Sequence, residues 1–233
     1  MKIFWCLIFS HFLADFTFQT NYIAQWKDKN IWGRWAHVFI FMAVSLVMTF
    51  PALGELWVNY GFIRLNGWAS LVILTMLHLA EDQFRIWCVH KRKLNDNTLF
   101  FLYDQTVHIG LIIVFTPWSK NMALFDTVWM QLGTLFVLNT HFATILIYYL
   151  EKDFFREHSM VVATKYFAIA ERIIIASLFI LPGWWWTGLI ALWIGYWSMK
   201  KIRGLNDRTW FDLVLSYGIA GLTGYAARII LFP

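Results

Sequence analysis

The chain has 233 residues, of which 60% are apolar, 20% are aromatic and only 14% are charged. An ordinary soluble domain has about 45–50% apolar and about 25% charged residues, so this composition excludes a soluble globular protein. A net charge of +5 is compatible with nucleic-acid binding or with basic membrane loops. The two cysteines, Cys6 and Cys88, are too few for a disulfide framework and too far apart for a paired metal motif.

Apolar runs of spanning length recur along the whole chain. A spanning helix needs about 20 mainly apolar residues, and the sequence predicts eight such helices. Their ranges are 3–23, 35–50, 67–87, 98–117, 128–150, 164–181, 184–199 and 211–231. The sixth and seventh ranges could instead form one re-entrant hairpin bent at Pro182-Gly183, so seven spans is the alternative. The predicted fold is an all-α polytopic integral membrane protein.

The predicted helices group into two halves. Residues 1–117 form a four-helix half that carries the His/Asp motifs described below, and residues 118–233 form a second four-helix half. We expect one integrated membrane domain. The first half also resembles a duplicated hairpin, since HFLAD and HLAED each open a polar segment that leads into a basic loop. Duplication and convergence explain this match equally well.

Basic residues cluster after the odd-numbered predicted spans. They are Lys27, Lys29 and Arg34; Arg85, Lys91, Arg92 and Lys93; Lys152, Arg156 and Lys165; and Lys200, Lys201, Arg203 and Arg208. The intervening loops carry only Arg64 and Lys120. Cytoplasmic loops of membrane proteins are enriched in Lys and Arg, so both termini are predicted to be non-cytoplasmic, in a multi-pass protein of the bacterial inner membrane. The same distribution argues for the lipid bilayer as the partner and against nucleic acid.

Charged side chains inside the predicted spans are costly. Each costs about 2.5–3.5 kcal/mol at the centre of a spanning helix, so each needs a partner or a function. Three pairs share one spacing, namely His11 with Asp15, His78 with Asp82, and Asp104 with His108. Residues four apart lie on one helix face, about 6 Å from each other. Because the third pair is reversed on a helix of opposite direction, the topology predicts three histidines at one depth and three aspartates one turn nearer the cytoplasm.

Three chemical interpretations fit this His/Asp layer. The first is a Zn²⁺ or Fe²⁺ site, because imidazole and carboxylate are standard ligands of both ions. The candidate ligands are His11, His78, His108, Asp82 and Asp104, with His37 at the rim. The second interpretation is a proton or ion relay. The third is purely structural hydrogen bonding between helices, in which each aspartate accepts from its histidine.

The favoured function is a metal-dependent hydrolase that acts on an amphiphilic or lipid-like substrate from the cytoplasmic side. The metal would activate water, an aspartate among Asp15, Asp82 and Asp104 would act as general base, and Gln19 and Gln105 would orient water or substrate. The alternatives are a proton- or ion-coupled transporter or channel, and a non-catalytic subunit of a larger membrane complex. A homo-oligomer is compatible with each of these functions.

Two further polar residues stand inside the sixth predicted span. Glu171 and Arg172 are adjacent, so they point about 100° apart on a helix and cannot pair with each other. We expect each to form a structural ion pair elsewhere, Arg172 with an aspartate of the predicted layer. His141 is isolated in the fifth span and is interpreted as a satisfied core residue.

Small and aromatic residues give two packing signals in the second half. Ser216, Ala220 and Gly224 recur every four residues, which predicts close contact with another helix of the same chain. The run Trp184 to Trp186 is typical of an aromatic belt at the outer membrane interface.

The motifs together resemble a known family. The pattern begins with HFLADFTFQT and continues with a lysine-containing loop and a histidine in the next span. It ends with His-x-x-x-Asp and Asp-Gln-x-x-His. This pattern resembles a family of bacterial inner-membrane proteins of unknown function, and Ala-Ile-Ala-Glu171-Arg172 with the basic stretch after the seventh span resembles its second region. The sequence departs from the pattern at Glu81 and at Arg85, where lysine is expected. The resemblance implies a polytopic membrane protein and brings no activity with it. In site logic alone, the layer is also similar to membrane-embedded zinc hydrolases such as the alkaline ceramidases and adiponectin-type receptors.

Overall fold

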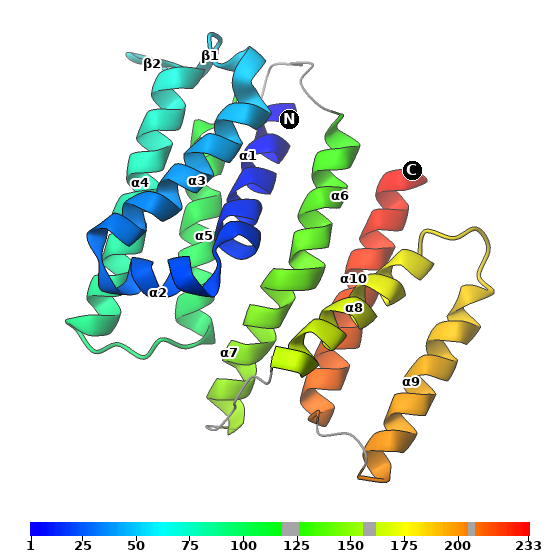
Figure 1. Ribbon diagram of the computed structural model, residues 1–233. Helices are drawn as coiled ribbons and strands as arrows, with labels where there is room; N and C mark the ends of the chain where they lie inside the picture. Colours follow the sequence, from blue (N-terminus) through cyan, green and yellow to red (C-terminus); the bar gives the residue numbers. More distant parts are fainter. Residues whose placement is uncertain (118–125, 156–161, 205–207) are drawn as a thin grey trace. The chain divides into compact units, whose positions relative to one another are not determined.

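The computed structural model describes residues 1–117, 126–155, 162–204 and 208–233, with the backbone alone for 162–164. In the first part of the chain the elements are α1 (Lys2–Phe12), the π-helix η1 (Leu13–Phe18), α2 (Asn21–Lys29), α3 (Ile31–Thr49), the short helix η2 (Phe50–Ala52), β1 (Leu56–Tyr60), β2 (Ile63–Asn66), α4 (Gly67–His90) and α5 (Thr98–Phe115). They are followed by α6 (Thr127–Val137), the π-helix η3 (Leu138–Phe142), α7 (Ala143–Phe155), α8 (Val162–Leu178), α9 (Trp186–Ile202) and α10 (Trp210–Leu231) (Figure 1). Lys120 and Arg156 lie outside the described residues.

The chain divides into two compact units, which we call unit 1 (Met1–Thr134) and unit 2 (Leu135–Pro233). The division falls inside α6, whereas the sequence predicted two halves that meet after residue 117. Each of the eight predicted ranges falls largely on helix, so the mostly helical fold is confirmed.

Side-chain caps mark where several helices begin. Asn30, Asn66 and Asn97 each accept a hydrogen bond from a backbone N–H two or three residues ahead, at the starts of α3, α4 and α5. Thr209 does the same for α10. These caps satisfy N–H groups that have no partner inside the helix, which explains why each apolar segment begins helical structure at that residue.

Four helical segments are long and apolar enough to cross a membrane: Ile31–Ala52, Thr98–Phe115, Thr127–Phe155 and Trp210–Leu231. The segments Lys2–Phe18 and Asn21–Lys29 add a fifth if the bent pair is one span. The predicted count of eight is not confirmed. α8 and α9 have 17 residues each, fewer than the roughly 20 of an ordinary span, and α4 carries Glu81, Asp82 and Arg85 in its second half.

Two predicted features are wrong in detail. The first predicted span runs through residue 23, but η1 ends at Phe18 and the chain turns by 95° into α2. Thr20 stabilises the start of the new helix after this turn, because its hydroxyl oxygen accepts a hydrogen bond from Ile23 N. The fold is also not purely helical, since β1 and β2 form an antiparallel hairpin between α3 and α4.

In unit 1, α1, α3, α4 and α5 pack against one another. Helix α2 lies across one end of these helices, beside the α4–α5 connection, and the β1–β2 hairpin lies at the other end (Figure 1). The basic residues sort by end: Lys27, Lys29 and Lys91 are on α2 or follow α4, whereas Arg64 is on the hairpin. One end of unit 1 is therefore strongly basic.

In unit 2, α10 packs closely on α8. Ser216, Ala220 and Gly224 are buried on one face of α10. A side chain added at Gly224 would come within 2.9 Å of the Ala176 Cα and carbonyl oxygen on α8. The predicted small-residue contact within the chain is thus confirmed, because only glycine lets the two backbones approach this closely.

Candidate metal centre

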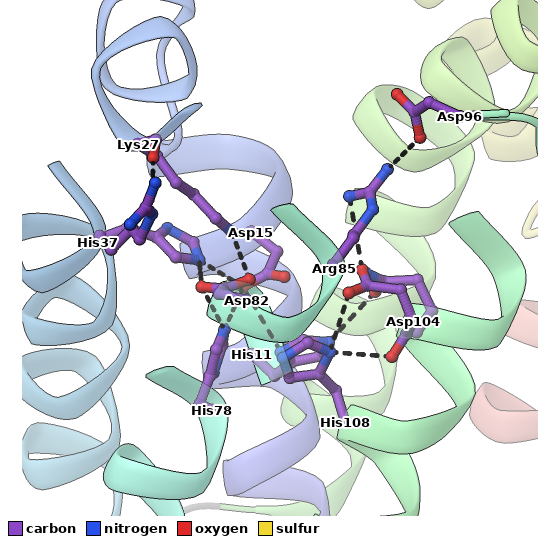
Figure 2. A network of polar contacts seen from close by, with 12 residues as sticks. His11, Asp15, Lys27, His37, His78, Asp82, Arg85, Asp96, Asp104 and His108 are labelled. Carbon is purple, nitrogen blue, oxygen red and sulfur yellow. Dashed lines mark hydrogen bonds and ion pairs between the residues drawn. The ribbon is translucent and has the colours of Figure 1, made fainter. Parts of the chain in front are cut away.

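Four histidines and three aspartates converge in the interior of unit 1. They are His11 from α1, Asp15 from η1, His37 from α3, His78 and Asp82 from α4, and Asp104 and His108 from α5. Each is at most 7% exposed, and Figure 2 shows their side chains pointing toward one another. The ring centroids of His78 and His108 lie 4.2 Å apart, and His37 lies 5.3 Å from His78. We call these seven residues the His/Asp cluster.

The carboxylates of Asp15 and Asp82 face the same two imidazoles. Asp15 Oδ1 lies 3.4 Å from His37 Nε2 and 3.6 Å from His78 Nε2. Asp82 Oδ2 lies 3.6 Å and 3.7 Å from the same two nitrogens. Within the described part of the chain, none of these four buried atoms makes a hydrogen bond.

The spacing of these atoms suits ligands of one cation. The distances exceed those of ordinary N–H···O hydrogen bonds, which are about 2.7–3.2 Å. Two atoms that each lie 2.0–2.2 Å from a shared ion, at angles of about 90–110°, are roughly 2.8–3.6 Å apart. Three overlapping groups have ligand atoms within 4.8 Å of one another: His11, Asp15 and His78; His37, His78 and Asp82; and Asp82, Asp104 and His108. The cluster could therefore hold a metal ion.

Neighbouring groups fix the tautomer of His108. His108 Nδ1 lies 2.8 Å from the backbone carbonyl oxygen of Asp104, and a carbonyl only accepts, so Nδ1 carries the proton. Nε2 is then left with its lone pair, and it is buried without a hydrogen-bond partner among the described residues. Histidines that bind metals are oriented in this way, with the other ring nitrogen donating to a carbonyl or carboxylate.

Gln105 fixes His11 by the same logic. Gln105 Nε2 donates to Asp104 Oδ2 at 3.0 Å, so Gln105 Oε1 accepts from His11 Nε2 at 3.2 Å. His11 Nδ1 therefore presents a lone pair, and it faces Asp15 Oδ1 at 3.5 Å. Two acceptors repel each other at this distance in a buried site, so a cation or an additional proton is needed between them.

Positive charge balances only part of the cluster. Lys27 reaches in from α2, with Nζ 2.6 Å from Asp82 Oδ1 (Figure 2). Arg85 lies 3.6 Å from Asp104 Oδ2 and 2.9 Å from Asp96 Oδ1. Among the described residues, Asp15 contacts only histidines. Burial of an uncompensated carboxylate is expensive, so the cluster has room for one more positive charge beside Asp15.

The structure adds two residues to the predicted cluster and leaves one predicted residue untested. Gln19 follows η1 and makes no side-chain hydrogen bond within the described residues, so its role in orienting water or substrate stays a prediction. Lys27 and Arg85 were interpreted only as topology signals, although both contact cluster carboxylates. The one signal that could have found them is the need of buried aspartates for counter-charges.

Asp15 lies in an unusual segment of backbone. η1 is a π-helix, and such turns are rare and occur often at functional sites. The 95° bend that follows η1 directs α2 across the end of the unit, and Lys27 on α2 thereby reaches Asp82. The local backbone thus supplies both the uncompensated carboxylate and the nearest ammonium.

A second polar cluster lies in unit 2, and it differs from the prediction. Arg172 was expected to pair with an aspartate of the layer, but its described contacts are neutral: it donates to the backbone carbonyls of Asn139 and Thr140 and to the hydroxyls of Thr144 and Ser216. Arg172 is therefore a hydrogen-bonded cation of the unit 2 core. His141 lies beside this cluster in η3 and contacts Thr140.

Glu171 does form an ion pair, with Arg208. Its carboxylate also accepts from Trp193 Nε1 at 2.9 Å and from the Tyr217 hydroxyl at 3.2 Å. Burial alone would lower the pKa of the Arg208 guanidinium, but its hydrogen bond with Asp212 and the charge of that residue raise the pKa above its ordinary value. The Glu171 carboxylate thus has three donors, Trp193, Tyr217 and Arg208, and one of them is its ion-pair partner.

The fold and the cluster define a helical protein with candidate membrane spans and a buried His/Asp site that could hold a metal. Residues 3–135 match the family described as "Protein of unknown function (DUF3307)". The match covers more than half of the chain, which therefore belongs to this family, in agreement with the predicted membership of a family of unknown function. All seven residues of the His/Asp cluster lie within the matched range. None of the curated proteins and none of the solved structures compared with the chain matches it.

Proposed function

We propose that unit 1 binds a divalent metal ion, Zn²⁺ or Fe²⁺, in the His/Asp cluster and uses it as a membrane-embedded hydrolase for an amphiphilic, lipid-like substrate. The observation that carries the proposal is the set of buried atoms that face one another and make no hydrogen bond to any described residue, centred on Asp15 Oδ1. Such atoms are costly unless a cation completes them. His37, His78, Asp15 and Asp82 are the proposed ligands, and His11 and His108 present further lone pairs beside them.

Each residue of the cluster has a proposed task in this hydrolase. A divalent ion supplies Lewis acidity, the chemistry that makes hydrolysis fast at neutral pH. Asp104 Oδ1 is buried without a partner among the described residues and is the proposed general base. Gln105 and the Asp104 carbonyl hold the lone pairs of His11 and His108 in place. Lys27 and Arg85 bring positive charge that favours an anionic group of the substrate.

The proposed orientation places the cluster near the cytoplasmic side. The basic residues of α2 and of the α4–α5 connection mark one end of unit 1, and the positive-inside rule assigns such an end to the cytoplasm. We extend this to the full proposal of eight spans, non-cytoplasmic termini and a bacterial inner membrane. Lys27, which is 13% exposed, then lies where a substrate from the inner leaflet would enter.

Metal analysis of the purified protein tests the proposal. After growth with added zinc and iron, the wild type should carry a stoichiometric metal by elemental mass spectrometry. His78→Ala and Asp82→Asn should lose it. The matched control is His90→Ala, because His90 is a half-exposed histidine of the same helix that pairs with Asp28. A wild type that stays free of metal, or a His90 variant that loses metal equally, would contradict the proposal.

One observation favours a second candidate, a proton or ion relay. A continuous chain of polar contacts leads from the cluster to a partly exposed carboxylate. It runs through His11, Gln105, Asp104, Arg85 and Asp96. Chains of this kind carry protons in pumps and transporters. In liposomes, the relay predicts a pH-driven flux that Asp104→Asn abolishes while the protein holds no tightly bound metal.

A further inference from the structure

An apolar cavity of about 690 Å³ lies between α8 and α9 in unit 2, far in sequence from the His/Asp cluster. Its lining from α8 includes Phe167, Ile174 and Leu178, and from α9 Leu189, Trp193 and Trp197. Several lining residues on α9 are exposed, among them Leu192 at 72%. The cavity therefore opens to the side of unit 2, toward lipid if these helices stand in a bilayer.

The cavity is long and follows the two antiparallel helices. The rings of Phe167 and Trp197 meet at one end, with centroids 5.4 Å apart, and Leu178 and Leu189 line the other. Phe167 and Leu178 are separated by about 16 Å along α8, at 1.5 Å per residue. An elongated apolar space of this length suits an acyl chain better than a compact ligand.

The polar groups of the cavity favour an anionic head over a cationic one. Glu171 lines the cavity, but its carboxylate is already used by Trp193, Tyr217 and Arg208. A lipophilic cation would have to displace one of these partners. In contrast, Trp197 Nε1 is a buried donor with no acceptor among the described residues, so the cavity lacks an acceptor at this end.

The same end of the cavity carries positive charge. The Lys200 ammonium lies 5.0 Å and 5.2 Å from the ring centroids of Tyr196 and Trp197, both of which line the cavity. Among the residues that the structure describes, no carboxylate lies within ion-pair distance of Lys200. Lys201 and the exposed Arg203 follow directly. Basic groups beside a groove between membrane helices are a known basis for binding anionic headgroups.

We propose that the α8–α9 cavity is a binding site for one anionic phospholipid. An acyl chain lies along the apolar walls, and the phosphate lies beside Lys200, where its oxygens accept from Trp197 Nε1. The proposal does not depend on the function of unit 1, since none of its residues belongs to the His/Asp cluster.

Native mass spectrometry of the full chain in detergent tests this site. The protein is titrated with phosphatidylglycerol, phosphatidylcholine of the same chains, or inorganic phosphate. We expect retention of phosphatidylglycerol only. Lys200→Gln should weaken this retention about fivefold, the effect of one lysine beside an anionic lipid. Trp197→Phe should also weaken it, because phenylalanine keeps an aromatic side chain but lacks the indole N–H donor. Arg64→Gln on the hairpin of unit 1 is the matched control for charge and should change nothing.

Other outcomes would overturn the proposal. Equal retention of the two lipids would show that the head is not recognised. Binding of tetraphenylphosphonium that depends on Glu171 and not on Lys200 would mean that the cavity takes lipophilic cations. If Trp197→Phe fails to fold, the result for Lys200→Gln decides alone, because Lys200 lies at the cavity's rim and its replacement leaves the apolar walls intact.

Discussion

The two units each bury charged groups among apolar helices, but they satisfy them in opposite ways. In unit 2, Glu171 receives three donors and Arg172 finds four neutral acceptors. In unit 1, ring nitrogens of His11, His37 and His78 face carboxylate oxygens without hydrogen bonds among the described residues. A cluster whose polar groups are paired within the protein serves stability, whereas a cluster of buried polar atoms without hydrogen-bond partners among the described residues could hold a cation.

Each unit contains one π-helix beside its buried polar cluster. η3 contributes the Asn139 and Thr140 carbonyls that accept from Arg172, and η1 contributes Asp15, whose carboxylate has no Lys or Arg partner among the described residues. The same backbone device therefore offers neutral acceptors in one unit and a charged acceptor in the other. The Arg172 guanidinium donates to the neutral acceptors, and we propose that a metal ion binds the charged one.

The largest effect is expected when the complete cluster is broken. Arg172→Met removes the donor to two buried carbonyls and two buried hydroxyls. The Thr140 carbonyl and the Thr144 hydroxyl keep their mutual hydrogen bond, but the Asn139 carbonyl and the Ser216 hydroxyl lose a donor, which should lower the free energy of unfolding by about 3 kcal/mol. The metal content should not change. Arg172→Lys should give a smaller loss, because an ammonium keeps the charge but not the planar set of donors. Thermal unfolding in detergent with parallel metal analysis measures both quantities.

A smaller effect is expected from a residue that orients a histidine beside the proposed ligands. Gln105→Leu frees the His11 imidazole from its acceptor, and such changes typically weaken metal binding about 10–100-fold. The neighbouring Thr106→Val is the control, since Thr106 is exposed and donates only to the Leu102 carbonyl of its own helix. Competition with a fluorescent zinc chelator gives the affinities. Equal affinities for wild type and Gln105→Leu would mean that His11 takes no part in the site.

The smallest effect should change sign with metal. Asp15→Asn removes a buried carboxylate whose ion-pair contacts, in the described part of the chain, are with histidines alone, so without metal the variant should be more stable than the wild type by about 1–2 kcal/mol. With saturating metal the wild type should be the more stable, because a bound ligand stabilises the folded state. Melting curves with chelator and with zinc reveal the crossing. Identical ranking in both conditions would contradict a metal beside Asp15.

Much of the fold was predictable because hydrophobic runs and helix caps are local. Each of the eight predicted ranges falls largely on helix, and Ser216, Ala220 and Gly224 do pack on α8. The turn after η1 and the β1–β2 hairpin were missed. A π-helical turn has no strong sequence signature, and the hairpin lies between the predicted spans 35–50 and 67–87, in a stretch that was predicted to be a loop.

The candidate site was predictable in its members but not in its partners. Spacing of four residues placed each histidine beside its own aspartate, and the assumption of a shared depth brought the three pairs together. Which residue contacts which depends on how the helices are rotated, and no local pattern encodes that. Lys27 therefore looked like a loop cation until the bend into α2 carried it to Asp82, and Arg172 found carbonyls where an aspartate was expected.

X-ray absorption spectroscopy on the zinc-loaded protein tests the central claim most directly, because it reports the atoms around the metal. The account predicts a first shell of nitrogen and oxygen at about 2.0–2.2 Å, with an imidazole signal that weakens in His37→Ala and is unchanged in His90→Ala. A shell with sulfur, or an imidazole signal that does not respond to His37, would contradict the assignment of the metal to the His/Asp cluster.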